Sequence, residues 1–331
     1  MEQKINTRGL VEAALMAVII TIILMVTSYI PLMYMFGIVV LPIPIAIIYC
    51  RHEFKYAMGS ILVSIFISSI FFNPIIALSY AISYATIGST LGYCIKNKIN
   101  PYKTLILVMV SCIISLIGEV LFAAIIMNNG NLSKFVSEQL ASYSEMINTI
   151  IEEMKNVYGN LELSTAQLQE LDKFSQIFSI KGIVMSIPGL ILIYSFTTSY
   201  ICFALVSKIL MRLRYNSIKI LDFSEFYVSN LIGAGLIAMI SVGVILNSKG
   251  VEWALIVYSA TMLFTIILMT INGMATVNYF LARKMKMPRV QKNIMIIIMF
   301  LLSAYVIFSV IGFVEMILDF RKLDPHRLRK V

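Results

Sequence analysis

The sequence predicts an all-α fold, a polytopic bundle of eight or nine transmembrane helices. Of the 331 residues, 60% are hydrophobic and 13% are charged, whereas soluble domains average about 25% charged residues. Long apolar runs recur along the chain, and most approach the roughly 20 residues that a helix needs to cross a bilayer. These observations predict an integral membrane protein that is embedded in the lipid bilayer as its partner.

Nine apolar segments are candidate membrane helices. They cover residues 10–30, 33–50, 57–72, 74–95, 104–127, 182–207, 226–246, 253–282 and 293–320. The last two are longer than one crossing requires. Asn272-Gly273 interrupts the first of these, and the second contains Ser309 and Gly312. Either is a candidate for a broken or re-entrant segment, which leaves open the choice between eight and nine crossings.

The distribution of basic residues predicts the orientation in the cell (plasma) membrane. If the N-terminus is cytoplasmic, the outer side receives few basic residues before residue 293, namely Lys134, Lys155, Lys173, Lys181 and Lys249. All the other Lys and Arg residues up to that point then lie on the cytoplasmic side, as is typical of membrane proteins. The net charge of +9 is therefore explained by orientation, and we expect no nucleic-acid partner.

Residues 128–181 are expected to form an extracytoplasmic helical insertion. Apolar residues from Val136 to Met154 follow helical spacing, and a second helix is expected to begin at Ser164, where Gln167 completes a capping box. The insertion is acidic overall. Such an amphipathic pair of helices could cap the bundle, bind a partner or lie on the lipid surface.

Polar residues inside the apolar segments are candidates for a ligand pocket. Glu119 lies well inside segment 104–127, where a carboxylate is costly and usually functional. It could bind a cationic or hydroxylated ligand or pass a proton, or it could be a protonated core residue. Tyrosines in the outer half of the bundle are typical of an interfacial belt or of a pocket wall. The candidate pocket residues are Glu119, Tyr80, Tyr84, Tyr194 and Asn73.

The first apolar segment carries a stripe of small residues. Gly9, Ala13 and Ala17 recur every fourth position, so they share one side of a helix. Small residues let helices approach closely in lipid. The small-residue stripe predicts either packing inside this protein or a docking face for another membrane subunit.

A second candidate contact surface lies near the C-terminus. Glu315 and Asp319 are one helical turn apart, and Lys322 follows three residues later. This spacing predicts a polar face, either as an ion-paired helix end or as a partner contact.

Several motifs of catalysis and cofactor binding are missing from the sequence. It has no Gly-x-x-x-x-Gly-Lys-Ser/Thr loop, no His-Glu-x-x-His and no Gly-x-Ser-x-Gly. Its four cysteines show no Cys-x-x-Cys spacing. We therefore expect no enzyme activity, no cofactor and no metal.

Three stretches carry a family resemblance: "TRGLVEAALMAVI", "VVLPIPIAIIYCRHEFKYAMGSILV" and "IGFVEMILDFRK". They resemble the YybS-like family of bacterial multi-pass membrane proteins, which is distantly similar to the substrate-binding S components of energy-coupling factor (ECF) vitamin transporters. The resemblance implies a six-helix S-component-like bundle in residues 1–212. The chain departs from S components by continuing with additional helices and a basic tail in residues 213–331. The resemblance also implies that Ala13 and Ala17 match the Ala-x-x-x-Ala pattern with which S components dock their coupling subunit.

Two functional hypotheses follow. In the first, the protein binds or transports an unknown small-molecule solute and is energised by a separate ECF-type coupling subunit and ATPases, as the resemblance implies. In the alternative, it is a non-transport scaffold or regulator that recruits an envelope partner through the insertion at 128–181.

Overall fold

The computed structural model describes residues 6–30, 33–71, 73–159, 180–215, 223–251, 253–301 and 305–324. These residues form helices and no strand, which confirms the predicted all-α class. Seven of their helices are long and apolar enough to cross a membrane, and two shorter apolar helices accompany them. The protein is therefore a polytopic helical membrane protein.

The chain divides into two compact units. Unit 1 comprises Met1–Ala141 and Tyr194–Ile220, and unit 2 comprises Ser142–Ile193 and Leu221–Val331. Compared with the ranges 1–212 and 213–331 expected from the sequence, the main difference is that residues 142–193 group with the C-terminal helices.

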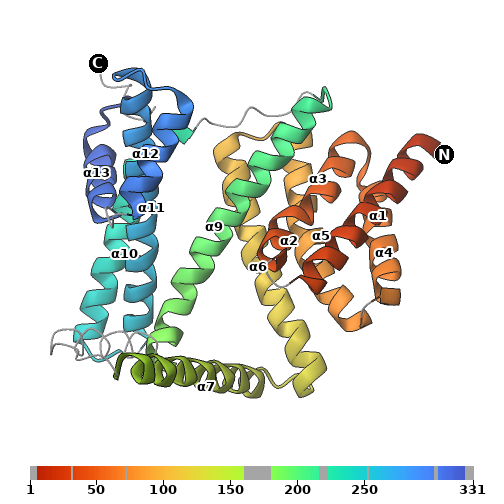
Figure 1. The fold of residues 1–331 in the computed structure, drawn as a ribbon, viewed down its shortest axis with the longest axis horizontal. Helices are drawn as coiled ribbons and strands as arrows, with labels where there is room; N and C mark the ends of the chain where they lie inside the picture. The colour runs from red at the N-terminus through yellow and green to blue at the C-terminus, as the bar shows by residue number, and fades with distance from the viewer. Residues whose placement is uncertain are drawn as a thin grey trace. The chain divides into compact units, whose positions relative to one another are not determined.

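Unit 1 holds the N-terminal helices. These are α1 (Thr7–Tyr29), α2 (Tyr34–Val40), α3 (Pro42–Arg51), α4 (Phe54–Phe71), α5 (Pro74–Lys96), α6 (Pro101–Asn128), the start of α7 (Leu132–Gly159) and the end of α9 (Ile180–Arg212). In Figure 1, α1 lies beside α4, and α3 lies beside α5. Helix α5 also packs against α6.

The tight turns before α5 and α6 use the same local chemistry. Asn73 and Asn100 each accept a hydrogen bond on the side-chain oxygen from the backbone N–H two residues later. The residue that follows each Asn is a proline, which suits the first helical position because its missing N–H would have no partner there. Asn-Pro therefore begins both helices within a short connection.

The segment expected at 33–50 is not one uninterrupted helix. It forms α2 and α3, which meet at Leu41. Pro42 and Pro44 have no N–H to donate to the preceding turn, so the hydrogen-bond ladder breaks there. Together the two helices cover about 27 Å at 1.5 Å per residue, close to the thickness of the hydrocarbon core.

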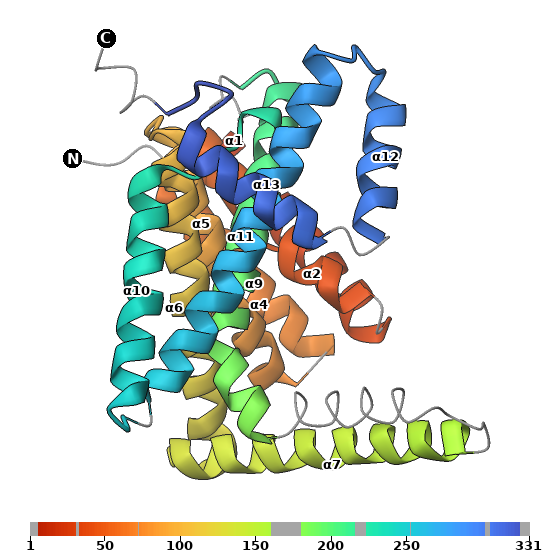
Figure 2. The ribbon, with the colours of Figure 1, turned by 90° about the vertical axis from the view of Figure 1, so that its left-hand side faces the viewer.

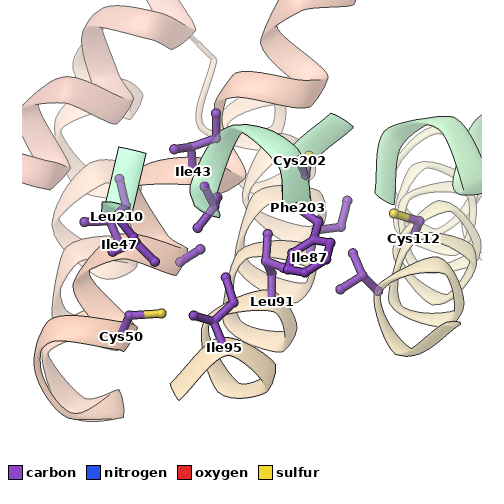
Figure 3. Close-up of a cluster of buried hydrophobic side chains, with 13 residues drawn as sticks. Ile43, Ile47, Cys50, Ile87, Leu91, Ile95, Cys112, Cys202, Phe203 and Leu210 are labelled. Carbon is purple, nitrogen blue, oxygen red and sulfur yellow. The ribbon is translucent and has the colours of Figure 1, made fainter. Parts of the chain in front are cut away.

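Helices α3, α5, α6 and α9 enclose a hydrophobic core in unit 1. Figure 3 shows side chains from all four helices meeting, and its labelled members include Ile43, Ile47, Ile87, Leu91, Cys112, Cys202 and Phe203. The approach of α3 to α5 depends on Gly88, because an added Cβ would lie 2.7 Å from the carbonyl oxygen of Pro42. All four cysteines are buried thiols without a disulfide.

The insertion begins with a long amphipathic helix, as the sequence predicts. Asn129 adopts a left-handed conformation that ends α6, and α7 starts three residues later. The side-chain amide of Asn128 donates to Glu138 Oε2 over 2.8 Å and so ties the corner between the two helices. The second helix expected from Ser164 lies outside the described residues.

Unit 2 holds the C-terminal helices. Besides parts of α7 and α9, it contains the 3₁₀ turn η2 (Phe223–Glu225), α10 (Asn230–Ser248), α11 (Ala254–Arg283), α12 (Arg289–Leu301) and α13 (Tyr305–Leu318). Helix α11 runs without interruption through Asn272-Gly273, whereas the segment expected at 293–320 is divided into α12 and α13. Of the two candidates for a broken segment, the C-terminal one is therefore the broken one.

Helices α12 and α13 form a hairpin against α11. In Figure 2, α12 runs back from the end of α11 and α13 crosses α11. Gly273 and Gly312 lie at the crossing, where a Cβ on either glycine would collide with the backbone of the other helix. After α13, Arg321 Nη1 donates to the carbonyls of Ser224 and Phe226, just before α10 begins. The chain thus enters the hairpin and leaves it at the same end of unit 2.

Candidate ligand pocket in unit 1

Unit 1 contains a cavity of about 520 Å³ between its helices. Cavities that bind small molecules usually measure about 300–1,000 Å³ and are mostly apolar, with a few placed polar groups. This one fits that description. Its wall is formed by Ile38, Leu41, Ile76, Ser79, Tyr80, Ser83, Tyr84, Leu116, Glu119, Ala123 and Tyr194.

Helical spacing brings the polar wall together. On α5, Ile76, Tyr80 and Ser83 follow one another by three or four residues and therefore share a side of the helix. On α6, Glu119 lies about 14 Å before the end of the helix at 1.5 Å per residue. Because α5 begins where α6 ends, the cavity lies in the half of unit 1 nearest the α6–α7 corner.

Glu119 is the acidic residue of this wall. Its side chain is half-buried, and the Ser83 hydroxyl donates to Glu119 Oε1. Among the described residues that line the cavity there is no Lys, Arg or His. The carboxyl group is thus held by a neutral donor, and the wall supplies no positive charge to balance it.

Tyr84 joins the pocket to the core of unit 1. It is only 1% exposed, and its hydroxyl forms a 2.9 Å hydrogen bond with the Ser64 hydroxyl of α4. Tyr80 and Tyr194 are half-buried and line the cavity from α5 and α9. Burial and the hydrogen bond to Ser64 therefore hold the Tyr84 ring in place in the cavity wall.

Four of the five residues that the sequence suggested for a pocket line the same cavity. These are Glu119, Tyr80, Tyr84 and Tyr194, and whether they bind a ligand stays a prediction. Asn73 is the exception, because it is exposed and caps α5, accepting from the Ile75 N–H over 2.9 Å. Sequence reasoning missed Ser83, although its position three residues after Tyr80 placed it on the same side of α5.

The small-residue stripe of α1 is covered by the protein's own helix. Gly9, Ala13 and Ala17 are all buried, and the Ser60 hydroxyl of α4 donates to the carbonyl of Ala13 over 2.6 Å. A Cβ on Gly9 would lie 3.0 Å from the Tyr56 ring. These contacts favour packing inside the protein, and a role in docking another subunit stays a prediction.

The C-terminal polar residues do not share one helical face. Helix α13 ends at Leu318, and Asp319 has a φ of 47°, so its carboxylate turns to accept from the N–H groups of Leu323 and Asp324. Glu315 pairs with Arg321 over 2.7 Å instead of with Lys322, which is exposed. Glu315 thus forms an ion pair at the end of α13 with Arg321 rather than with Lys322, because the chain reverses after α13. A partner contact through Glu315, Asp319 and Lys322 stays a prediction.

Arg321 connects this ion pair to the helix crossing. Its Nη2 donates to Asn272 Oδ1 over 3.0 Å, and Asn272 Nδ2 donates to the carbonyl of Gly312 over 2.8 Å. The side chains of Glu315 and Arg321 are 3% and 0% exposed. These hydrogen bonds link α11, α13 and the turn before α10, and they leave Glu315 Oε2 buried without a partner.

The long apolar helices define the chain as a polytopic membrane protein, and unit 1 holds a partly open cavity. A family described as predicted membrane protein (DUF2232) matches residues 18–316, and the chain belongs to this family. Comparisons with curated proteins and with solved structures gave no match.

Proposed function

We propose that this protein is the solute-binding subunit of a membrane transport system, comparable in role to the S components of ECF transporters. The observation that carries the proposal is the 520 Å³ cavity of unit 1, with an apolar and tyrosine-rich wall around one carboxyl group. The resemblance to the YybS-like family and to S components supports it. Because the chain has no phosphate-binding loop, a separate coupling subunit and ATPases would supply the energy.

Solute binding is tested by blocking the cavity. We expect at least one member of a panel of vitamins, amines and nucleosides to raise the melting temperature of the purified protein. Ala123→Phe places a ring in the cavity and should abolish that rise. The matched control is Ile125→Phe, which adds the same ring at a side chain that is 60% exposed. A rise that persists in Ala123→Phe, or a panel without any effect, would overturn the proposal.

We further propose that the protein lies in the cell membrane with a cytoplasmic N-terminus. The basic residues support this orientation, and the hairpin of α12 and α13 would return Arg321 and Lys322 to the same cytoplasmic side. Introducing a cysteine at Glu153 in a cysteine-free variant tests it. An impermeant thiol reagent should label this position from outside intact cells, and labelling from the cytoplasmic side alone would reverse the orientation.

The second candidate function is a membrane scaffold that recruits a partner through α7. The scaffold hypothesis is favoured by one face of α7, which carries exposed apolar residues such as Val136, Tyr143 and Ile150. Glu145 and Glu152 lie on the opposite face of the helix. Co-purification from native membranes separates the two candidates. An ATPase pair with a coupling protein supports the transport subunit, whereas envelope proteins alone support the scaffold.

A substitution in α7 also distinguishes the scaffold from the transport subunit. Tyr143→Glu places a charge on the exposed apolar face, where it should not unfold the protein because this side chain is already 54% exposed. Under the scaffold hypothesis, envelope proteins should no longer co-purify. Under the transport hypothesis, the thermal shift caused by the solute should be retained. Glu145→Gln on the opposite face is the control.

A further inference from the structure

We propose that the pocket of unit 1 selects an organic cation with a single positive charge, such as an amine or a quaternary ammonium compound. This inference rests on the proposed solute-binding function and names the substrate class of the same site. It is drawn from the charge balance of the cavity and from the chemistry of its wall.

The charge balance of the cavity predicts that the ligand is positively charged. Glu119 lies inside a membrane-spanning helix, where an uncompensated carboxylate is expensive. Among the described lining residues, Glu119 accepts a hydrogen bond from the neutral Ser83 hydroxyl, and none of them is basic. A bound cation would supply the missing charge, and one carboxylate balances one positive charge. An anionic solute would instead meet like charge without a compensating base.

The apolar and aromatic residues of the cavity wall predict that the ligand is an organic molecule. Leu41, Ile76 and Leu116 offer hydrocarbon, which would bury the carbon skeleton of a ligand. Tyr80 and Tyr194 add aromatic rings, which attract cations through their π-faces. Inorganic cations such as Ca²⁺ require six to eight oxygen ligands, and among the described residues no group of three His, Cys, Asp or Glu side chains could hold a metal ion.

Two other carboxylates of the described helices, Glu12 and Glu315, show how the protein balances such a charge. Glu12 accepts from Arg8 Nε and Arg51 Nη2, each over 3.2 Å, and Glu315 accepts from Arg321. In both cases the protein brings its own guanidinium group to the carboxylate. At Glu119 the corresponding space is the cavity itself.

The experiment compares cations with neutral molecules of the same shape. We would measure binding of 2-phenylethylamine against 2-phenylethanol, and of choline against 3,3-dimethylbutan-1-ol, to the full-length protein in a neutral detergent. The cation of each pair should bind at least tenfold more tightly. Glu119→Gln should remove the preference, leaving each pair within about threefold, while Glu119→Asp should retain part of it. Gel filtration and melting curves check that both variants are folded.

The outcomes separate this inference from the function on which it rests. If neutral and charged members bind equally, and Ala123→Phe abolishes both, the pocket binds solutes but the cation inference is wrong. A preference that survives in Glu119→Gln would also overturn it. If none of these probes binds, the cation inference fails, and the solute panel then decides the proposed function independently.

Discussion

The two units place a glutamate inside the protein in opposite ways. In unit 1, Glu119 is half-buried beside a cavity and accepts a hydrogen bond from Ser83. In unit 2, Glu315 is 3% exposed and paired with Arg321, which also binds Asn272 and two backbone carbonyls. Both residues sit in apolar helices, and in the sequence alone they look similar.

The difference teaches how to separate a structural carboxylate from a functional one. A buried charge is tolerated when the fold supplies its counter-charge and the remaining hydrogen bonds. Glu315 receives its counter-charge from Arg321 within unit 2, although its Oε2 is buried without a hydrogen-bond partner, and this ion pair contributes to holding helices together. Glu119 has space beside it where Glu315 has a guanidinium group. The stability of the solute-free Arg321→Ala and Glu119→Gln variants tests this contrast.

The largest effect is expected from removing the partner of Glu315. Arg321→Ala would leave a buried carboxylate unpaired and would free two backbone carbonyls, which typically costs about 3–5 kcal/mol of unfolding free energy. Denaturation by SDS, followed in mixed micelles, measures the loss. Lys322→Ala is the control and should leave stability unchanged, because this side chain is exposed. Equal losses in both variants would mean that the network is not formed.

The next effect concerns the crossing of α11 and α13. Gly312→Leu would drive a side chain into the backbone of α11 near Met269, and backbone cannot move aside as a flexible side chain can. We expect a loss of about 3 kcal/mol, at the upper end of overpacking costs, in the same SDS titration. Gly235→Leu on α10 is the matched control, since an added Cβ there meets nothing within 4 Å. A stable Gly312→Leu variant would show that the two helices do not cross at this point.

Sequence patterns predicted the helices, and most of the residues that were grouped as a pocket do line one cavity, whereas the contacts of unit 2 were not predicted. Apolar runs located the membrane helices, and Glu119 with Tyr80, Tyr84 and Tyr194 could be grouped because intramembrane polar residues are rare. The pairing of Glu315 was missed because it depends on the chain reversing after Leu318, where Asp319 leaves helical geometry. The break at Pro42 could have been read from the prolines, whereas the role of Gly312 depends on which helix crosses it.

A smaller effect is expected on the small-residue stripe of α1. Ala17 is 0% exposed, so Ala17→Trp should force α1 away from its neighbours and cost about 1–3 kcal/mol. Melting of the isolated protein measures this. Val18→Trp, at a side chain that is 47% exposed, should have little effect. If Ala17→Trp instead leaves melting unchanged and abolishes co-purification of a coupling subunit, the stripe is a docking face after all.

The smallest effect on stability is expected at the pocket. Glu119→Gln keeps the shape of the side chain and can still accept from Ser83 through its amide oxygen, and no guanidinium partner is left unpaired in the described wall. We therefore expect the solute-free protein to lose less than about 1 kcal/mol, or to gain slightly, because a site held ready for a ligand is often not the most stable arrangement. The same SDS titration that reports on Arg321→Ala measures it. A loss as large as that of Arg321→Ala would mean that Glu119 has a structural partner of its own. The contrast between the two glutamates would then disappear, and with it the reason to expect a cation from outside.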